Sequence, residues 1–80
     1  MALTERERSI IDFERTWWTL DGGRDELIRA SFDCTPEAFD VELAGLVDSP
    51  DALAHDPLVV RRLRRERDRK RRSRVEGTAR

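Results

Sequence analysis

The sequence contains a single cysteine, Cys34, and a single histidine, His55. One cysteine cannot form an internal disulfide, so we expect Cys34 to be a small buried apolar residue in a reducing compartment. One cysteine and one histidine do not make a zinc site, and the carboxylates lack the spacing of a calcium loop. His55 stands directly before a predicted helix cap, where we expect a structural or solvent-exposed side chain. The sequence therefore predicts no metal site.

Glycine-rich phosphate loops and nucleophile elbows are also missing. The stretch DGGR at residues 21–24 is predicted to be a helix stop, because glycine readily takes the left-handed conformation that ends helices. We expect no catalytic residue, no cofactor and no enzymatic activity.

Long apolar runs are absent as well. No stretch approaches the roughly 18 apolar residues that suggest a membrane span. The first residues, MALTERERS, contain no apolar signal core, so secretion is not expected. We expect a cytoplasmic protein without a membrane partner.

The apolar residues that are present suffice for one small core. Eighty residues, 38% of them hydrophobic and including two tryptophans and three phenylalanines, make one domain at most. Charged residues make up 41% of the chain, against roughly 25% in typical soluble domains. This excess lies mostly in the C-terminal part of the chain, which is therefore a solvated or ligand-facing segment.

Capping signals and apolar spacing predict an all-α fold. Thr4 and Glu7 form a capping box that starts the first helix. Later helices are expected at about 24–32, after Thr35-Pro36 and after Asp56-Pro57, with a single turn after Ser49-Pro50. No stretch shows the alternation of a strand. The residues expected to face the core in the first helix are Ile10, Ile11, Phe13, Trp17, Trp18 and Leu20, and in the last helix Leu58, Val59, Val60 and Leu63.

The adjacent tryptophans cannot face the core equally. Trp17 and Trp18 point about 100° apart on a helix. We expect one of them in the core, and the other either at the core rim or at a partner surface, where tryptophan is enriched.

Residues 25–47 have the pattern of a helix-turn-helix. Asp33 is a turn residue able to adopt positive φ, Thr35 is a cap, and Phe39 and Leu43 fall at core positions. In this arrangement the second helix usually enters the major groove, although a plain helical bundle has the same pattern. We predict a small helix-turn-helix bundle of three to four helices over residues 1–60 and a projecting basic helix or tail over residues 61–80.

The expected recognition helix, PEAFDVELAG, is poorly suited to reading DNA. Residues 30–60 contain neither lysine nor arginine, and an acidic helix is repelled by the phosphates. Arginine, lysine, asparagine and glutamine, which read base edges, are absent from it. Its side opposite the core presents Glu37, Val41, Ala44, Gly45 and Asp48.

Charge is distributed very unevenly along the chain. Residues 1–60 hold five arginines and fourteen acidic residues, a balance of −9, whereas residues 61–80 hold eleven basic and three acidic residues, a balance of +8. Such asymmetry indicates a polyanionic partner or self-assembly.

Four segments, ERSIIDFERTWW, IRASF, LVDSPDALAHDP and LVVRRLRR, resemble an uncharacterised actinobacterial domain-of-unknown-function family. The resemblance covers roughly residues 5–72, and FERTWW and DPLVVRRLRR are its most specific parts. It implies a helix-turn-helix domain with an Arg-rich C-terminal end and an expectation of DNA binding, without an established activity. The family pattern carries Arg, Tyr and Gln on the third helix, and PEAFDVELAG departs from that pattern.

We expect double-stranded DNA as the partner, bound in transcription regulation or nucleoid organisation. RNA is an alternative, since arginine-rich segments also fold on it. A solvated tail without a ligand is the simplest alternative. Beyond Arg65 we expect the helix to fray alone and to order on a polyanion. The predicted phosphate contacts are Arg61, Arg62, Arg64, Arg65, Arg67, Arg69, Lys70, Arg71, Arg72 and Arg74, with additional backbone contacts from Arg6, Arg8, Arg24 and Arg29.

An interaction adaptor is the rival class. The basic tail of one chain complements the acidic body of another, which would give a homodimer or a larger self-assembly. The partner surface would then consist of Val41, Ala44 and Gly45, with Trp18, and a protein of the transcription machinery is the other partner we consider.

Overall fold

A computed structural model of the chain describes the backbone of residues 2–78 and the side chains of residues 2–72. This described part contains five α-helices, one 3₁₀ turn and no strand, so the all-α prediction is confirmed. In chain order the elements are α1 (Glu5–Thr16), η1 (Trp17–Thr19), α2 (Arg24–Phe32), α3 (Pro36–Leu46), α4 (Pro50–His55) and α5 (Pro57–Thr78).

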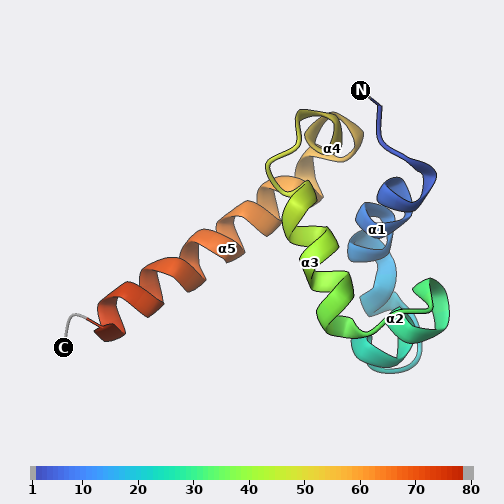
Figure 1. Cartoon of the computed structure of the whole chain (residues 1–80), viewed down its shortest axis with the longest axis horizontal. Coiled ribbons are helices and arrows are strands. Elements are labelled where there is room, and N and C mark those ends of the chain that lie inside the picture. Colours follow the sequence, from blue (N-terminus) through green and yellow to red (C-terminus); the bar gives the residue numbers. More distant parts are fainter. Residues whose placement is uncertain (1, 79–80) are drawn as a thin grey trace.

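The helices form a body from which one long helix extends. Helices α1, α2 and α3 lie together, α4 packs beside the start of α5, and the C-terminal end of α5 lies far from the other elements (Figure 1). With 22 residues, α5 is about 33 Å long. The sequence predicted fraying beyond Arg65, whereas α5 is one continuous helix through Thr78.

Side-chain caps explain where most helices begin. At α1 the Glu7 amide donates to Thr4 Oγ1 over 3.1 Å and the Thr4 amide donates to Glu7 Oε1 over 2.8 Å, which confirms the capping box. The hydroxyls of Thr35 and Ser49 cap α3 and α4, and each is followed by a proline at the first helical position.

The predicted end of the first helix at Leu20 is wrong, because α1 ends at Thr16. At this end, threonine hydroxyls donate hydrogen bonds to backbone carbonyls. Thr16 Oγ1 donates to the Asp12 carbonyl over 3.2 Å, and Thr19 Oγ1 donates to the Thr16 carbonyl over 2.7 Å. Such bonds compete with the helical pattern, and the chain tightens into the 3₁₀ turn η1.

The early helix end removes two apolar side chains from the core. Leu20 is 53% exposed and Trp18 is 64% exposed, so neither continues the predicted stripe. Trp17 is half-buried against the core. The two tryptophans therefore differ as expected, with Trp18 on the surface.

Helices α2 and α3 are joined by a short turn that begins at Asp33. Asp33 takes the left-handed conformation with φ 52° and ψ 44°, as the helix-turn-helix pattern requires. The Cys34 side chain is half-buried instead of fully buried, and its Sγ lies 3.8 Å from Arg6 Nη2.

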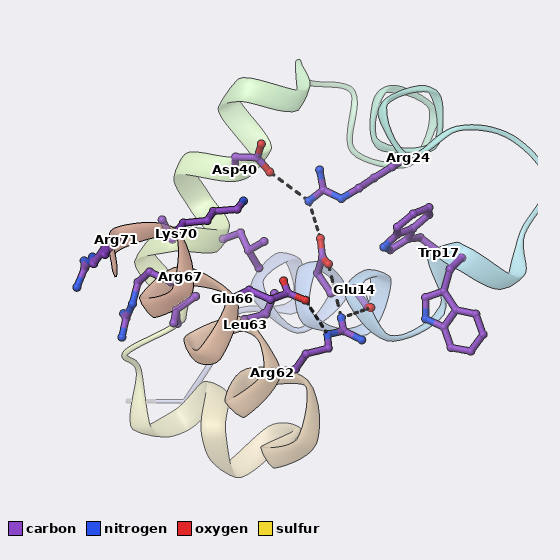
Figure 2. Close-up of a pocket in the computed structure, with 14 residues that line it drawn as sticks. Glu14, Trp17, Arg24, Asp40, Arg62, Leu63, Glu66, Arg67, Lys70 and Arg71 are labelled. Carbon is purple, nitrogen blue, oxygen red and sulfur yellow. Dashed lines mark hydrogen bonds and ion pairs between the residues drawn. The ribbon is translucent and has the colours of Figure 1, made fainter. Parts of the chain in front are cut away.

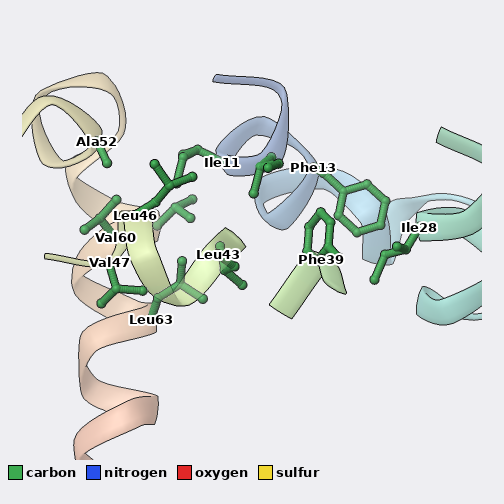
Figure 3. Close-up of a cluster of buried hydrophobic side chains, with 12 residues drawn as sticks. Ile11, Phe13, Ile28, Phe39, Leu43, Leu46, Val47, Ala52, Val60 and Leu63 are labelled. Carbon is green, nitrogen blue, oxygen red and sulfur yellow. The ribbon is translucent and has the colours of Figure 1, made fainter. Parts of the chain in front are cut away.

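The core has an aromatic half and an aliphatic half (Figure 3). Phe13, Phe32 and Phe39 contact one another with ring centroids 5.1–5.5 Å apart. The buried hydrophobic residues are Ile10, Ile11, Phe13, Ile28, Phe39, Leu43, Leu46, Val47, Ala52, Val59, Val60 and Leu63.

Leu58 was predicted to anchor the last helix, and this is wrong, since its side chain is 74% exposed. Val59, Val60 and Leu63 bury the face of α5 that meets the body. Leu58 lies about 160° around the helix from Val60 and therefore points to solvent.

Candidate nucleic-acid interface

Helix α5 begins at a buried cap. The Val59 amide donates to Asp56 Oδ1 over 3.3 Å, and Arg15 Nη1 donates to Asp56 Oδ2 over 3.1 Å. Pro57 follows the cap as the first residue of α5. The carboxylate therefore fixes the start of α5 and ties it to α1.

Three of the predicted phosphate contacts are bonded to the body. Arg62 Nη2 donates to the Glu14 carbonyl over 2.8 Å, and Arg64 Nε donates to the Val47 carbonyl over 2.7 Å. Arg67 Nη1 bonds both carboxylate oxygens of Asp48 at 2.9 Å. These arginines hold α5 against α1 and against the end of α3.

The Arg67–Asp48 ion pair shifts the pKa values of both side chains. The hydrogen bond from Arg67, helped by the charges of Arg67, Arg64 and Arg71, lowers the pKa of Asp48 below its ordinary value. The hydrogen bond to Asp48 raises the pKa of Arg67 above its ordinary value. Both groups are therefore charged at neutral pH.

Four other arginines of α5 form what we term the arginine ridge: Arg61, Arg65, Arg69 and Arg72. All four are exposed, and within the described part of the chain none makes a hydrogen bond or an ion pair. At roughly 100° per residue, each lies more than about 120° from the direction in which Val60 and Leu63 enter the core. The arginine ridge therefore runs along the solvent side of α5.

Lys70 and Arg71 lie on a different face of the helix. They line an open cleft of about 810 Å³ between α5, α3 and η1 (Figure 2). Glu14, Arg24 and Arg62 also line this cleft.

Arg74, the last predicted contact, lies in α5, but its side chain is outside the described residues. Of the four body arginines predicted as additional backbone contacts, three are already bonded within the body. Arg6 is paired with Glu42, Arg24 with Glu14 and Asp40, and Arg8 bonds the Leu3 carbonyl. Arg29 is exposed on α2.

Two acidic residues of α3 and Asp48, just beyond its end, pair with arginines from three different helices. Arg6 of α1 lies 3.0 Å from Glu42, Arg24 of α2 lies 3.1 Å from Asp40, and Arg67 of α5 reaches Asp48 just beyond α3.

The pKa values of two of these arginines follow from the pairing. Bonding to Glu42 raises the pKa of Arg6. Burial acts to lower the pKa of Arg24, but the hydrogen bonds to Glu14 and Asp40 outweigh it and raise that pKa.

Between these pairs, α3 presents a small, flat surface. Val41 is 74% exposed, Ala44 is exposed, and nothing lies within 4 Å of a Cβ added at Gly45. Together with Trp18 these residues were predicted as a partner surface. Trp18 and Ala44 both line the cleft, whereas Val41 and Gly45 do not.

The family model described as "Protein of unknown function (DUF3263)" matches residues 2–75 of the chain. The chain belongs to DUF3263. The match confirms that the chain belongs to a family of unknown function, and it extends slightly beyond the predicted residues 5–72. No curated protein and no solved structure matches the DUF3263 chain.

In the described part of the DUF3263 chain, no helix has the length and apolarity that crossing a membrane requires. Over the same residues, His, Cys, Asp and Glu side chains nowhere gather into a group of three that could hold a metal ion. His55 Nε2 instead lies 2.8 Å from Asp12 Oδ1.

The division of the basic residues into body-bound and ridge arginines was not predicted. Arg64, for example, does not lie with Arg61, Arg65 and Arg72, because its Nε donates to the Val47 carbonyl. A usable signal was present in the spacing. Residues three and four positions from Leu63 along α5 share its face, which points to Arg67 but not to Arg65.

Proposed function

We propose that this chain binds DNA through the arginine ridge of α5, in transcription regulation or nucleoid organisation. The observation that carries the proposal is that four exposed arginines lie along one face of a projecting helix with no carboxylate partner among the described residues. Free guanidinium groups suit phosphate, because their planar fork can donate two hydrogen bonds to one phosphate group.

The size of the ridge suits a duplex. From Arg61 to Arg72 the helix rises about 16 Å. Duplex DNA carries about one negative charge per 1.7 Å of axis, so several phosphates lie within reach of this length. If each ridge arginine neutralises one phosphate, the slope of log Kobs against log salt is about −3.6.

The composition of α3 argues for binding with little sequence preference. Its outward face offers no arginine, lysine, asparagine or glutamine for base edges. Its carboxylates Asp40 and Glu42 are held in ion pairs and are not available to accept from cytosine. We therefore assign α3 a structural role and the DNA contact to α5.

The experiment compares two four-fold variants by fluorescence anisotropy with a mixed-sequence duplex at about 50, 100 and 200 mM salt. R61A/R65A/R69A/R72A is expected to lose most of the affinity and most of the salt slope. The matched control, R61K/R65K/R69K/R72K, keeps the four charges and is expected to retain the slope with somewhat weaker binding.

Unchanged binding by the alanine variant would overturn the proposal. Single-stranded RNA measured alongside identifies the nucleic acid. Tighter binding to RNA than to the duplex at every salt concentration would contradict DNA as the ligand.

A second candidate function rests on α3. Because its ion pairs leave Val41, Ala44 and Gly45 as a flat apolar surface, α3 also suits close packing against a helix of a protein of the transcription machinery. The substitution Val41→Arg distinguishes DNA binding by α3 from protein binding by α3. It strengthens DNA binding if α3 enters the groove, and it disrupts a protein contact if α3 packs against a partner.

A further inference from the structure

The cleft between α5, α3 and η1 has two chemically different sides. Figure 2 shows Lys70 and Arg71 on one side and Trp17 across from them. Leu43 and Leu63 also line the cleft and belong to the apolar core.

The α5 side carries free positive charge. Lys70 and Arg71 are exposed, and among the described residues neither makes a hydrogen bond or an ion pair. The charge of Arg71 contributes only at longer range, by lowering the pKa of Asp48. Both side chains can therefore bind a carboxylate that comes from outside the chain.

The opposite side of the cleft carries exposed apolar surface, with free negative charge next to it along the chain. Trp18 lines the cleft, and it and Leu20, which does not line it, are two of the exposed large hydrophobic residues. Asp21 follows Leu20, and Asp25 lies in the first turn of α2. Neither of these two acids lines the cleft, and both are exposed without a hydrogen bond or an ion pair in the described part of the chain. An exposed tryptophan is more typical of an interface than of a solvated turn.

We propose that a second copy of this chain docks on the cleft about a two-fold axis. A two-fold axis that runs along the cleft places each side opposite the other side of its mate. Lys70 and Arg71 of each copy then lie opposite Asp21 and Asp25 of the other, and Trp18 becomes covered. The occupant follows from charge complementarity, since the chain carries both halves of the contact.

This dimer does not depend on the proposed DNA contact. The arginine ridge lies on another face of α5 and contributes no residue to the cleft. The R61A/R65A/R69A/R72A variant is therefore expected to associate as the wild type does, whatever its affinity for DNA.

The test is a charge swap on the full chain, followed by sedimentation velocity over a range of concentrations. In K70E/R71E both halves of the proposed contact are negative, and in D21K/D25K both are positive. Each variant alone is expected to self-associate on the order of ten-fold more weakly than the wild type. An equimolar mixture is expected to recover association, because both contacts are then between opposite charges.

Tryptophan emission reports on the same site. Trp17 and Trp18 are the only tryptophans in the sequence, and both line the cleft. A blue shift that follows wild-type association, and that returns in the mixture, supports the dimer. Circular dichroism confirms that each variant is folded.

Any one of three results would overturn the proposal. The first is a wild type that stays monomeric at every concentration. The second is association of the two charge variants as strong as that of the wild type, and the third is failure of the folded variants to associate when they are mixed. Loss of association only on Val41→Arg would move the contact to the outer face of α3 and would equally contradict docking on the cleft.

Discussion

Glu14 is a buried carboxylate at which arginines from two other helices meet. It is 5% exposed, and Arg24 Nη2 lies 2.7 Å from its Oε1 while Arg62 Nη2 lies 3.8 Å from its Oε2. Glu14→Gln keeps the shape and removes the charge, which leaves two half-buried arginines without their shared anion. We expect the free energy of unfolding to fall by about 2 kcal/mol, measured by denaturant titration.

Glu37→Gln is the matched control for Glu14. Glu37 is an exposed residue of α3 without an ion pair in the described part of the chain. Its replacement is expected to change the unfolding free energy by less than about 0.5 kcal/mol. Equal effects of the two substitutions would contradict a stabilising role for the Glu14 cluster.

Asp48 makes part of the stability depend on pH. Because Arg67 lowers the pKa of Asp48 in the folded chain, the folded state favours the ionised carboxylate. This contribution is fully present above the unfolded pKa of about 3.9 and is lost as the pH falls through the lower folded pKa. We expect wild type to exceed Asp48→Asn in unfolding free energy at neutral pH, with the difference shrinking below about pH 4. Denaturant titrations across this range measure it, and a constant difference would contradict the mechanism.

At the scale of the element, the arginine ridge destabilises helix α5, which carries it. Arg61 with Arg65, and Arg65 with Arg69, are like-charged pairs four residues apart, each of which destabilises a helix by about 0.2–0.5 kcal/mol. R61A/R65A/R69A/R72A is therefore expected to be at least as helical and as heat-stable as the wild type. Circular dichroism and thermal melting check this. A lower Tm would mean that the ridge arginines make contacts within the folded chain.

Most helix starts could be predicted from the sequence because their causes are local. Thr4, Thr35, Ser49 and Asp56 each cap a helix within three residues of themselves. The end of α1 could not be predicted this way. Its apolar spacing continues to Leu20, and only the threonine bonds at Thr16 and Thr19 oppose it.

The candidate interface was predicted only in outline. The position of the basic helix followed from composition, but its arginines look alike in sequence. Arg62, Arg64 and Arg67 differ from the ridge because of acceptors 17 to 48 residues away along the chain. Spacing from Leu63 points to Arg67 alone, so the contacts of Arg62 and Arg64 required the tertiary structure.

At the scale of the whole molecule, the start of the basic helix is packed against the acidic body. Leu63 is buried in the core, and Arg62 and Arg64 bond carbonyls of the body. A chain that stops after Val60 loses these contacts, about 3–5 kcal/mol in total. That is a large part of the stability of a small domain. We expect such a truncation to lower the Tm strongly in circular dichroism.

A stop codon after Arg72 provides the control. It keeps Leu63, Arg62, Arg64 and Arg67, and the Tm is expected to stay close to that of the full chain. A truncation after Val60 that melts like the full chain would show that the body folds without α5.

The three arginines that pair with carboxylates on and just beyond α3 also limit how this surface can evolve. Each belongs to a different helix: Arg6 pairs with Glu42, Arg24 with Asp40, and Arg67 with Asp48. A single mutation that gave α3 a base-reading residue at Glu42 would leave Arg6 without its carboxylate, and one at Asp40 would remove one of the two carboxylates that pair with Arg24. The first mutational steps from this α3 toward a sequence-reading helix are therefore unfavourable, and new nucleic-acid specificity would arise more readily on the unconstrained face of α5.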